Sequence, residues 1–455
     1  MCYKELNNKP LPNIPIVVPL QSVIIYTMIM IDKLIPGGQA LATLPDGKKA
    51  FFWNALPGEI VESYEITKNK SHYIEAIATA IDHPSAHRTE PKDSCFLSTS
   101  PWQIIDYDYE LKLKQELVVE LFREHDITID TPEIFTDNQD YHYRNKMEYA
   151  LYWDHDTSQI SLAFHSRGSH RKIPISKSSI ERPEIFQKAE QIVNELNQHH
   201  EEARKYQSLL LRCSQDGTVS GGLYENNKPH PVFDNLTDEI LGHKYFYSPN
   251  GFFQINPPVY EMALKEIKRH ITTDNVLDLY SGVGTIGLSV AHDKHLTLVE
   301  CDKFAYSEMA KNIARKTEFG NGVTRGLPEV TTEDEGASPV TTGASDPSRE
   351  NTISNSEIVR SGNIFAILEK SENVTYYITP DQTVILDPPR AGCDKKLIQK
   401  LNEVKPTKII YLSCNPATQA RDVKLLLDNY HIEDVKTFNF FPHTPHIENL
   451  VVLSL

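Results

Sequence analysis

The chain has 455 residues, of which 40% are hydrophobic and 24% are charged, and its formal net charge is −16 at pH 7. This length exceeds one ordinary domain, so we expect two or three globular domains. The acidic balance excludes broad, sequence-blind binding of polyanions, because such binding depends on Lys and Arg side chains that meet phosphates. Any contact with nucleic acid must therefore be local.

The longest apolar run, Val23 to Ile31, is far shorter than the roughly 20 residues that cross a bilayer, and it lacks the flanks of a secretory signal. We therefore expect no membrane partner. We interpret residues 1–27 as an extension outside the folded part, with Met28 or Met30 as alternative starts. The six cysteines stand singly, which favours a reducing cytoplasm and predicts no metal site.

Residues 28–85 have the pattern of a small all-β domain. Short alternating segments are separated by Pro-Gly-Gly, Pro-Asp-Gly and Pro-Gly turns. We predict a five-stranded, OB-like barrel, a fold that commonly binds nucleic acid. The predicted strands are Met28–Lys33, Gln39–Leu44, Lys49–Asn54, Glu59–Thr67 and His72–Ile81.

Residues 86–245 predict a central α+β domain. An amphipathic helix falls within 104–124, and alternating segments at Lys146–Phe164 and Ser208–Tyr224 flank a helical segment, Pro183–His199. The stretch Tyr141–Arg182 holds seven basic residues against four acidic ones. It is either a solvated sheet face or a local RNA-binding surface.

From residue 246 to residue 455 helices and strands alternate, which predicts a doubly wound, mostly parallel α/β sheet. Residues 320–356 are rich in small polar and acidic residues, so we interpret them as a disordered insertion. The predicted strands are Asn275–Leu279, Leu296–Cys301, Thr383–Leu386, Lys408–Leu412 and Leu450–Leu453. The predicted helices are Val259–His270, Gly284–Ala291, Phe304–Lys316 and Lys395–Leu401.

The segment from Val276 to Gly284 ends a buried strand in Asp278 and continues into a glycine turn. Glycine lets a ligand approach the backbone. With Gly287 the turn also spells G-x-G-x-x-G, which fits a nicotinamide cofactor as well. Glu300 ends the next strand, where its carboxylate can accept both hydroxyls of a ribose.

Two further strands end in chemically active residues. In Ile385-Leu386-Asp387-Pro388-Pro389-Arg390 the rigid prolines direct Asp387 into the crevice at the sheet edge. In Ser413-Cys414-Asn415-Pro416 a thiol reaches the same edge, unless it is a buried core cysteine. A thiolate there can add to C6 of a uracil and so make C5 nucleophilic.

Such an adduct must then lose its C5 proton to a general base. Glu448 precedes an apolar closing strand, where a carboxylate is unusual unless it faces a crevice. His443 and His446 are rival bases. Gln254, in Phe252-Phe253-Gln254-Ile255-Asn256, can pair with a uracil edge or a cofactor carboxylate, or it is an ordinary loop residue.

With these motifs in order, residues 28–455 resemble the TRAM-containing RNA 5-methyluridine methyltransferases. The resemblance implies S-adenosylmethionine as cofactor and makes residues 28–85 a TRAM domain. It assigns cofactor contacts to Gln254, Tyr280, Gly282, Glu300, Asn363 and Asp387. It makes Cys414 the nucleophile and Glu448 the base, and Asp387 also contacts the target base.

Many relatives carry an iron–sulfur cluster on C-x5-C-x2-C and a distant fourth cysteine, whereas only Cys95 stands in the matching region here. We therefore expect no cluster. The resemblance implies a structured RNA partner, with 23S ribosomal RNA favoured over the T-loop of transfer RNA, and no obligate protein partner. An NAD(P)-dependent oxidoreductase and a non-catalytic RNA-folding factor remain alternatives.

Overall fold

The computed structural model describes residues 24–199, 205–226, 228–230, 233–321 and 358–455. The chain divides into two compact units, one of Met1–Leu34 and Gln39–Ser85, the other of Ile35–Gly38 and Ala86–Leu455. The predicted insertion, apart from 320–321, and most of the predicted extension lie outside the described residues. Within the described residues no helix is long and apolar enough to span a membrane.

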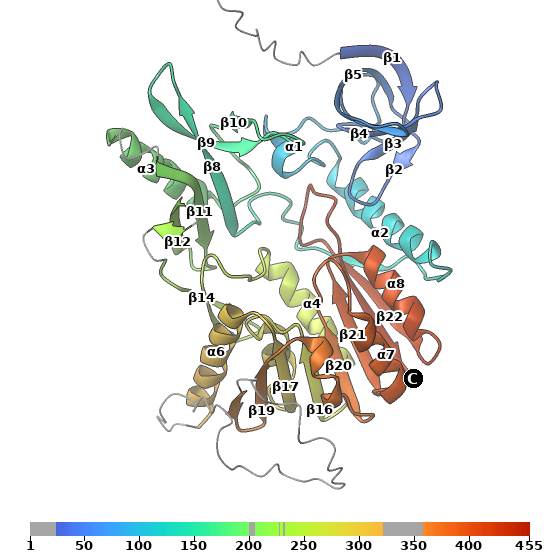
Figure 1. Cartoon of the computed structure of the whole chain (residues 1–455), viewed down its shortest axis with the longest axis vertical. Coiled ribbons are helices and arrows are strands. Elements are labelled where there is room, and N and C mark those ends of the chain that lie inside the picture. The colour runs from blue at the N-terminus through green and yellow to red at the C-terminus, as the bar shows by residue number, and fades with distance from the viewer. Residues whose placement is uncertain (1–23, 200–204, 227, 231–232, 322–357) are drawn as a thin grey trace, which may run out of the picture. The chain divides into compact units, whose positions relative to one another are not determined.

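The first unit is a curled sheet of six strands in the order β1-β5-β6-β4-β3-β2 (Figure 1). The prediction of five strands is wrong, because the first predicted strand is two. The amide of Ile31 donates to Glu59 beside β5, and that of Asp32 donates to Leu41 in β3. The chain therefore crosses from one edge of the sheet to the other at these two residues. The strands are β1 (Ile24–Met30), β2 (Lys33–Leu34), β3 (Ala40–Thr43), β4 (Lys49–Trp53), β5 (Ile60–Asn69) and β6 (Tyr73–His83).

The second unit contains an antiparallel sheet in the order β10-β9-β8-β11-β12-β13. Helix α3 (Pro183–Gln198) covers one face and buries Ile185, Ala189 and Val193 in its core. These elements confirm the predicted alternation and helix. The strands are β8 (Lys146–Asp154), β9 (Gln159–His165), β10 (Lys172–Pro174), β11 (Tyr206–Cys213), β12 (Val219–Glu225) and β13 (Lys228–His230).

The same unit contains a nine-stranded sheet in the order β18-β19-β17-β16-β20-β21-β23-β22-β7. The five strands from β19 to β21 are parallel, and β23 runs antiparallel between β21 and β22. The strands are β7 (Glu133–Phe135), β16 (Asn275–Leu279), β17 (His295–Glu300), β18 (Ile358–Ser361), β19 (Ile364–Leu368), β20 (Gln382–Leu386), β21 (Lys408–Ser413), β22 (His431–Phe438) and β23 (Glu448–Ser454).

Helices cover both faces of this sheet (Figure 1). Helices α4 (Pro257–His270), α5 (Thr285–Val290) and α6 (Lys303–Asn321) share one apolar core with alternate strand residues such as Leu298 and Ile410. Helices α7 (Lys395–Val404) and α8 (Pro416–Leu426) pack together outside that core, and α2 (Tyr107–Arg123) contacts α8. The domain is therefore doubly wound, and its carboxyl edge is open to ligands.

Several short elements complete the described part of the second unit. Helix α1 (Phe96–Thr99) precedes α2, and a hairpin of β14 (Leu236–Ile240) and β15 (His243–Tyr247) leads into the nine-stranded domain. Two 3-10 turns, Ser371–Asn373 and Thr375–Tyr377, follow β19. The first of these turns brings Ser371 to the carboxyl edge of the sheet.

Candidate active site

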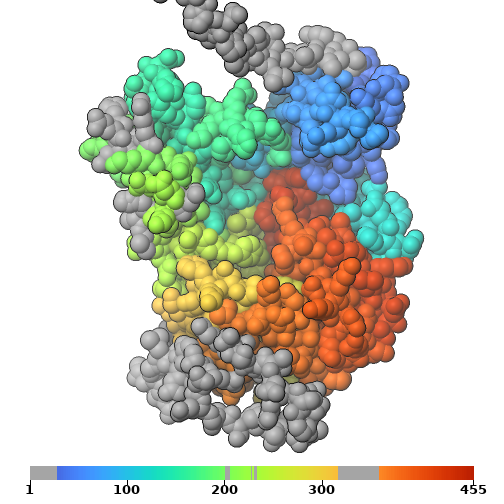
Figure 2. Space-filling model, in the orientation of Figure 1, coloured from blue at the N-terminus to red at the C-terminus, as the bar shows by residue number. Residues whose placement is uncertain are grey.

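A cavity of about 1690 Å³ opens at the carboxyl ends of the parallel strands. Its walls come from the glycine turn after β16, the ends of β17, β20 and β21, the start of β23, and the segment before α4. Figure 2 shows yellow segments near residue 300 beside orange segments beyond residue 380 at the surface. Of the residues predicted from motifs, it brings together Gln254, Tyr280, Gly282, Glu300, Asp387, Cys414 and Glu448.

The glycine turn has an unusual backbone. Tyr280 has φ of 64° and Gly282 has φ of 57°, both in the left-handed region. A Cβ on Gly282 would meet no atom within 4 Å, so the turn borders open space. Such a conformation costs free energy at a tyrosine and is typical of functional sites. The turn thus exposes its backbone to the cavity.

Glu300 closes this turn from the end of β17. One carboxylate oxygen accepts the amide of Gly282 at 2.8 Å, and the other accepts the amides of Cys301 and Asp302 at 2.7 Å each. A carboxylate has about four acceptor positions, so room for a ligand hydroxyl remains. The same bonds occupy the Gly282 amide, which a dinucleotide pyrophosphate would need.

Asp278 lies behind the turn and does not line the cavity. Its carboxylate accepts the Gly287 amide at 2.8 Å and so ties β16 to α5. Burial raises the pKa of Asp278 to about 8. Asp278 therefore shapes the turn from below.

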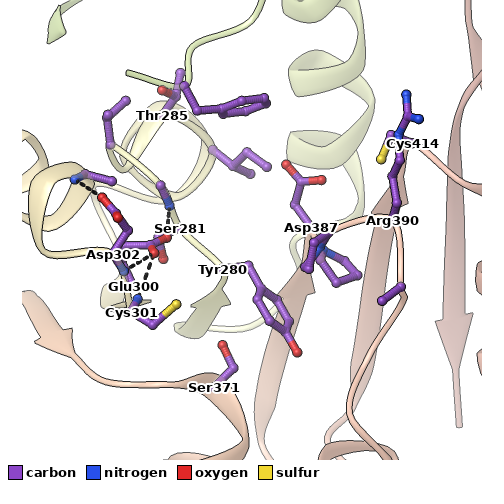
Figure 3. A pocket seen from close by; sticks show the side chains of 18 of the residues that line it. Tyr280, Ser281, Thr285, Glu300, Cys301, Asp302, Ser371, Asp387, Arg390 and Cys414 are labelled. Carbon is purple, nitrogen blue, oxygen red and sulfur yellow. Dashed lines mark hydrogen bonds between the residues drawn. The ribbon is translucent and has the colours of Figure 1, made fainter. Parts of the chain in front are cut away.

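Cys414 and Glu448 lie at the ends of two neighbouring strands. The last paired residues of β21 and β23 are Ser413 and Asn449, and Cys414 and Glu448 are the next residues toward the cavity, which both of them line. The two groups are close enough for the charge of Glu448 to act on the Cys414 thiol. Figure 3 shows Asp387 and Cys414 pointing toward the same part of the cavity, beside Arg390.

These three groups share a dry environment. Burial raises the pKa of Asp387 to about 7, and burial together with the charge of Asp387 holds the pKa of Glu448 well above its usual range. Burial, then the charges of Glu448 and Asp387, raises the pKa of Cys414 to about 11, while Arg390 acts in the opposite direction. Two carboxyl groups with raised pKa values beside a thiol suit proton transfer near neutral pH.

The two rival histidines differ. His446 lines the cavity, and its Nδ1 accepts from the Arg390 guanidinium at 3.2 Å. Burial and the charge of Arg390 lower its pKa to about 4, so its ring is neutral at pH 7. His443 does not line the cavity, and its Nε2 lies 3.1 Å from a carboxylate oxygen of Asp140. The structure thus contradicts the proposal of His443 as a base.

Asn363 is the one predicted cofactor contact that lies elsewhere. It precedes β19, which runs parallel to β17, so it sits at the amino end of the sheet, opposite to the cavity. Its amide donates to the carbonyls of His292 and Lys294. The prediction for Asn363 is therefore wrong: the residue joins two loops.

Sequence reasoning missed several lining residues. Ser371, which follows β19, is buried at the end of the cavity that holds Tyr280 and Glu300 (Figure 3), and no motif marks it. Arg212 comes from β11, outside the basic stretch that suggested RNA binding. From that stretch only Arg144 and Lys146 reach the cavity.

An iron–sulfur cluster does not fit the residues of the central region. Cys95 and Cys213 are buried in one apolar core, and burial raises the pKa of each thiol to about 11. Such a cluster needs four thiolates. Among the described residues, the one group with metal-ligating geometry is Glu266, His270 and Asp434, which contains no cysteine.

The doubly wound fold, with a thiol and paired carboxyls at its ligand edge, defines an α/β enzyme. Residues 356–455 match the family model described as tRNA (Uracil-5-)-methyltransferase. Proteins of Lactiplantibacillus plantarum and Lactobacillus johnsonii, described as uncharacterized RNA methyltransferases, are 26% and 27% identical to this chain. Each alignment covers 90% of this chain and more than nine-tenths of the relative.

A solved structure, described as Pyrococcus abyssi tRNA (uracil-54, C5)-methyltransferase in complex with S-adenosyl-L-homocysteine, has a similar fold. Its TM-score is 0.66 at 21% identity, over 94% of this chain and all of that one. This protein is an RNA (uracil-5-)-methyltransferase.

Proposed function

We propose that the protein methylates C5 of a uridine in folded RNA through a covalent bond between Cys414 and C6. The observation that carries the proposal is that Cys414, Glu448 and Asp387 lie at the ends of neighbouring strands and line one cavity. Sites on strands are held more precisely than sites built on loops alone.

S-adenosylmethionine fits the other end of the cavity, and when bound it supplies a methyl group on a sulfonium. Glu300 would accept a hydroxyl of its ribose, and the turn from Tyr280 to Gly282 would lie against the bound cofactor. Asp387 lies between this end and Cys414 (Figure 3), so it would contact both ligands, and Gln254, which also lines the cavity, would contact the cofactor. Ser371 takes the cofactor role that the sequence suggested for Asn363.

The Cys414 thiol releases its proton to solvent, and its sulfur forms a bond to C6 of the uracil. The electrons of the C5–C6 double bond move to C5, which would take the methyl group as the bond between that methyl and the donor sulfur breaks and leaves a neutral thioether. Glu448 then accepts the C5 proton, the C5–H electrons restore the double bond, and the C6–S bond breaks. The thiolate is regenerated. The covalent step contributes the nucleophilicity of C5 in the adduct, which C5 of unactivated uracil lacks.

Two cations at the cavity, Arg144 and Lys146, would contact the RNA, and the buried Arg212 adds its charge beside them. Arg144, Lys146 and Arg212 form no ion pair among the described residues, and their side chains donate hydrogen bonds to backbone carbonyls. Burial and the charge of Arg212 lower the pKa of Lys146 to about 8. Phosphate oxygens are the natural counter-charge for such a cluster. The target uridine must leave its stack to reach Cys414, which costs a few kcal/mol.

We favour ribosomal RNA as the target, because a small all-β unit like the N-terminal one suits binding to a structured RNA surface. A transfer RNA uridine is the second candidate, because the matching family model and the similar solved structure are both described as transfer RNA enzymes. Mapping 5-methyluridine in both RNAs from a deletion strain separates the two targets.

Neither alternative class explains the site as well. In dinucleotide-binding domains the strand order is 3-2-1-4-5-6, whereas here the antiparallel strand β23 interrupts that order. A non-catalytic RNA-folding factor would not need a thiol between two carboxyls.

Variants of the two central residues test the proposal. Cys414→Ala should abolish methyl transfer, because no adduct can form. Glu448→Gln should permit addition and methylation but stall release, and so accumulate a methylated protein–RNA complex that survives denaturation. Transfer of labelled methyl groups to RNA and to the complex measures both steps. Rapid turnover by the Gln variant would assign the base to another residue such as His446.

A further inference from the structure

The loop between β22 and β23 carries His446 and leads directly into Glu448. Its backbone is held from outside the loop at consecutive residues. Four successive carbonyls accept hydrogen bonds. The Asn256 side-chain amide donates to Phe440 at 3.2 Å, and the Lys114 ammonium donates to Phe441 at 3.0 Å. The Tyr143 hydroxyl donates to Pro442 and the Trp102 backbone amide donates to His443, both at 3.0 Å. Three of these donors, Lys114, Tyr143 and Trp102, lie roughly 300 residues or more before the carbonyls that they bind.

A fully buried ion pair on α2 is the centre of this arrangement. Glu110 and Lys114 have no exposed side-chain surface, and their charged atoms are 2.8 Å apart. Both oxygens of Glu110 accept the amide of His443, at 2.9 and 3.1 Å, and Lys114 also donates to the Asn439 side chain at 2.6 Å. Burial lowers the pKa of Lys114, while Glu110 acts in the opposite direction.

Stability alone does not account for such a pair, because well-packed apolar residues of similar volume are often as stable. The loop also holds His443 at φ of 59°, a conformation that a non-glycine residue keeps only when its surroundings enforce it. The contacts therefore impose one shape on the loop.

We propose that α2 and its flanking residues act as a clamp that positions Glu448, with Lys114 and Tyr143 as the positioning residues. The inference rests on the proposed role of Glu448 as the base. A base that has shifted by about 1 Å loses roughly a hundredfold in rate, whereas Cys414, on the rigid end of β21, keeps its place. The clamp thus acts on proton removal and leaves addition to C6 unaffected.

Tyr143→Phe tests the clamp with the smallest change, since it removes one hydroxyl that donates to Pro442. Tyr430→Phe is the matched control, because the Tyr430 hydroxyl is also buried and donates to the carbonyl of Pro406 at 2.9 Å, outside the cavity. Single-turnover reactions with labelled S-adenosylmethionine separate methyl transfer from release. We expect the denaturation-stable methylated complex to rise at least fivefold in Tyr143→Phe and to stay at the wild-type level in Tyr430→Phe.

A second variant, Glu110→Gln with Lys114→Met, removes both charges together and leaves no lone charge buried. It should slow release by about tenfold or more, with methyl transfer within threefold of wild type and a folded protein by thermal unfolding. Loss of addition and release in equal proportion, wild-type turnover in both variants, or failure of both to fold would overturn the clamp. If Glu448→Gln itself traps no complex, the proposed function fails instead.

Discussion

At the residue scale, burial and the neighbouring carboxyl groups control the protonation of the Cys414 thiol. Burial and two neighbouring carboxyls raise its pKa to about 11, so the thiol is protonated at neutral pH. The thiolate is the reactive form. Bound ligands must therefore activate it, and a cationic sulfonium nearby would favour the charged form.

This reasoning predicts the pH dependence of alkylation. Well below its pKa the thiolate fraction rises tenfold for each pH unit, so the rate of iodoacetamide labelling at Cys414 should rise about tenfold per unit between pH 7 and 9. Peptide mass spectrometry distinguishes Cys414 from the exposed Cys301. A rate that levels off below pH 8 would show a thiol that is already activated.

The motifs at strand ends could be predicted from the sequence because each couples an apolar run to an unusual polar residue. Asp387, Cys414 and Glu448 follow that rule, and all three reach the cavity. Asn363 and His443 are also polar residues close to apolar strands in the sequence, but neither of them lines the cavity. Asn363 lies at the wrong end of its strand, and His443 is held by Asp140, which is distant in the chain. No local sequence pattern reveals either fact.

At the element scale, buried strands were predictable and their order was not. The apolar runs of β16, β20 and β21 match the predicted ranges within one residue. The edge strands β7 and β18 and the next-to-edge strand β22 were missed because they are short or carry exposed polar residues. Helix α2 was found by its periodicity, but its packing against α8 rests on long-range contacts.

Gly287 tests how closely α5 packs on the sheet. A Cβ there would lie 2.7 Å from Leu298 and 2.8 Å from the Asp278 carboxylate. Gly287→Ala should therefore lower the free energy of unfolding by about 1–3 kcal/mol and weaken cofactor binding through the displaced turn. Gly47→Ala is the control for cofactor affinity by calorimetry, because it also strains a turn, at φ of 85°, but lies outside the cavity. Equal cofactor affinities of the two variants would show that the packing of α5 does not affect the cofactor site.

At the scale of the whole molecule, a chain with a net charge of −16 must bind RNA through a small cationic area. The cluster of Arg144, Lys146 and the buried Arg212 lines the cavity of the proposed site. Only the first two belong to the basic stretch of the sequence; within that stretch Arg182 pairs with Glu184, and Lys172 donates to a backbone carbonyl. Net charge by segment was therefore an incomplete guide to the binding face.

The salt dependence of RNA affinity should reflect this small number of contacts. Lys146→Gln should weaken binding of all RNA substrates to a similar degree and reduce the slope of log affinity against log salt by about one. Lys265→Gln, an exposed lysine of α4 outside the cavity, should leave the slope unchanged. Equal slopes for wild type and Lys146→Gln would show that the RNA avoids this cluster.

The most direct measurement of the central claim is the trapping of Cys414 on RNA that contains 5-fluorouridine in place of uridine. Fluorine cannot leave C5 as a proton does, so methylation should stop at a protein–RNA complex that survives denaturation. With S-adenosylmethionine present, mass spectrometry should locate the methylated pyrimidine on Cys414, and Cys414→Ala should form none. A complex joined through another residue, or none in an enzyme that methylates ordinary RNA, would contradict the account.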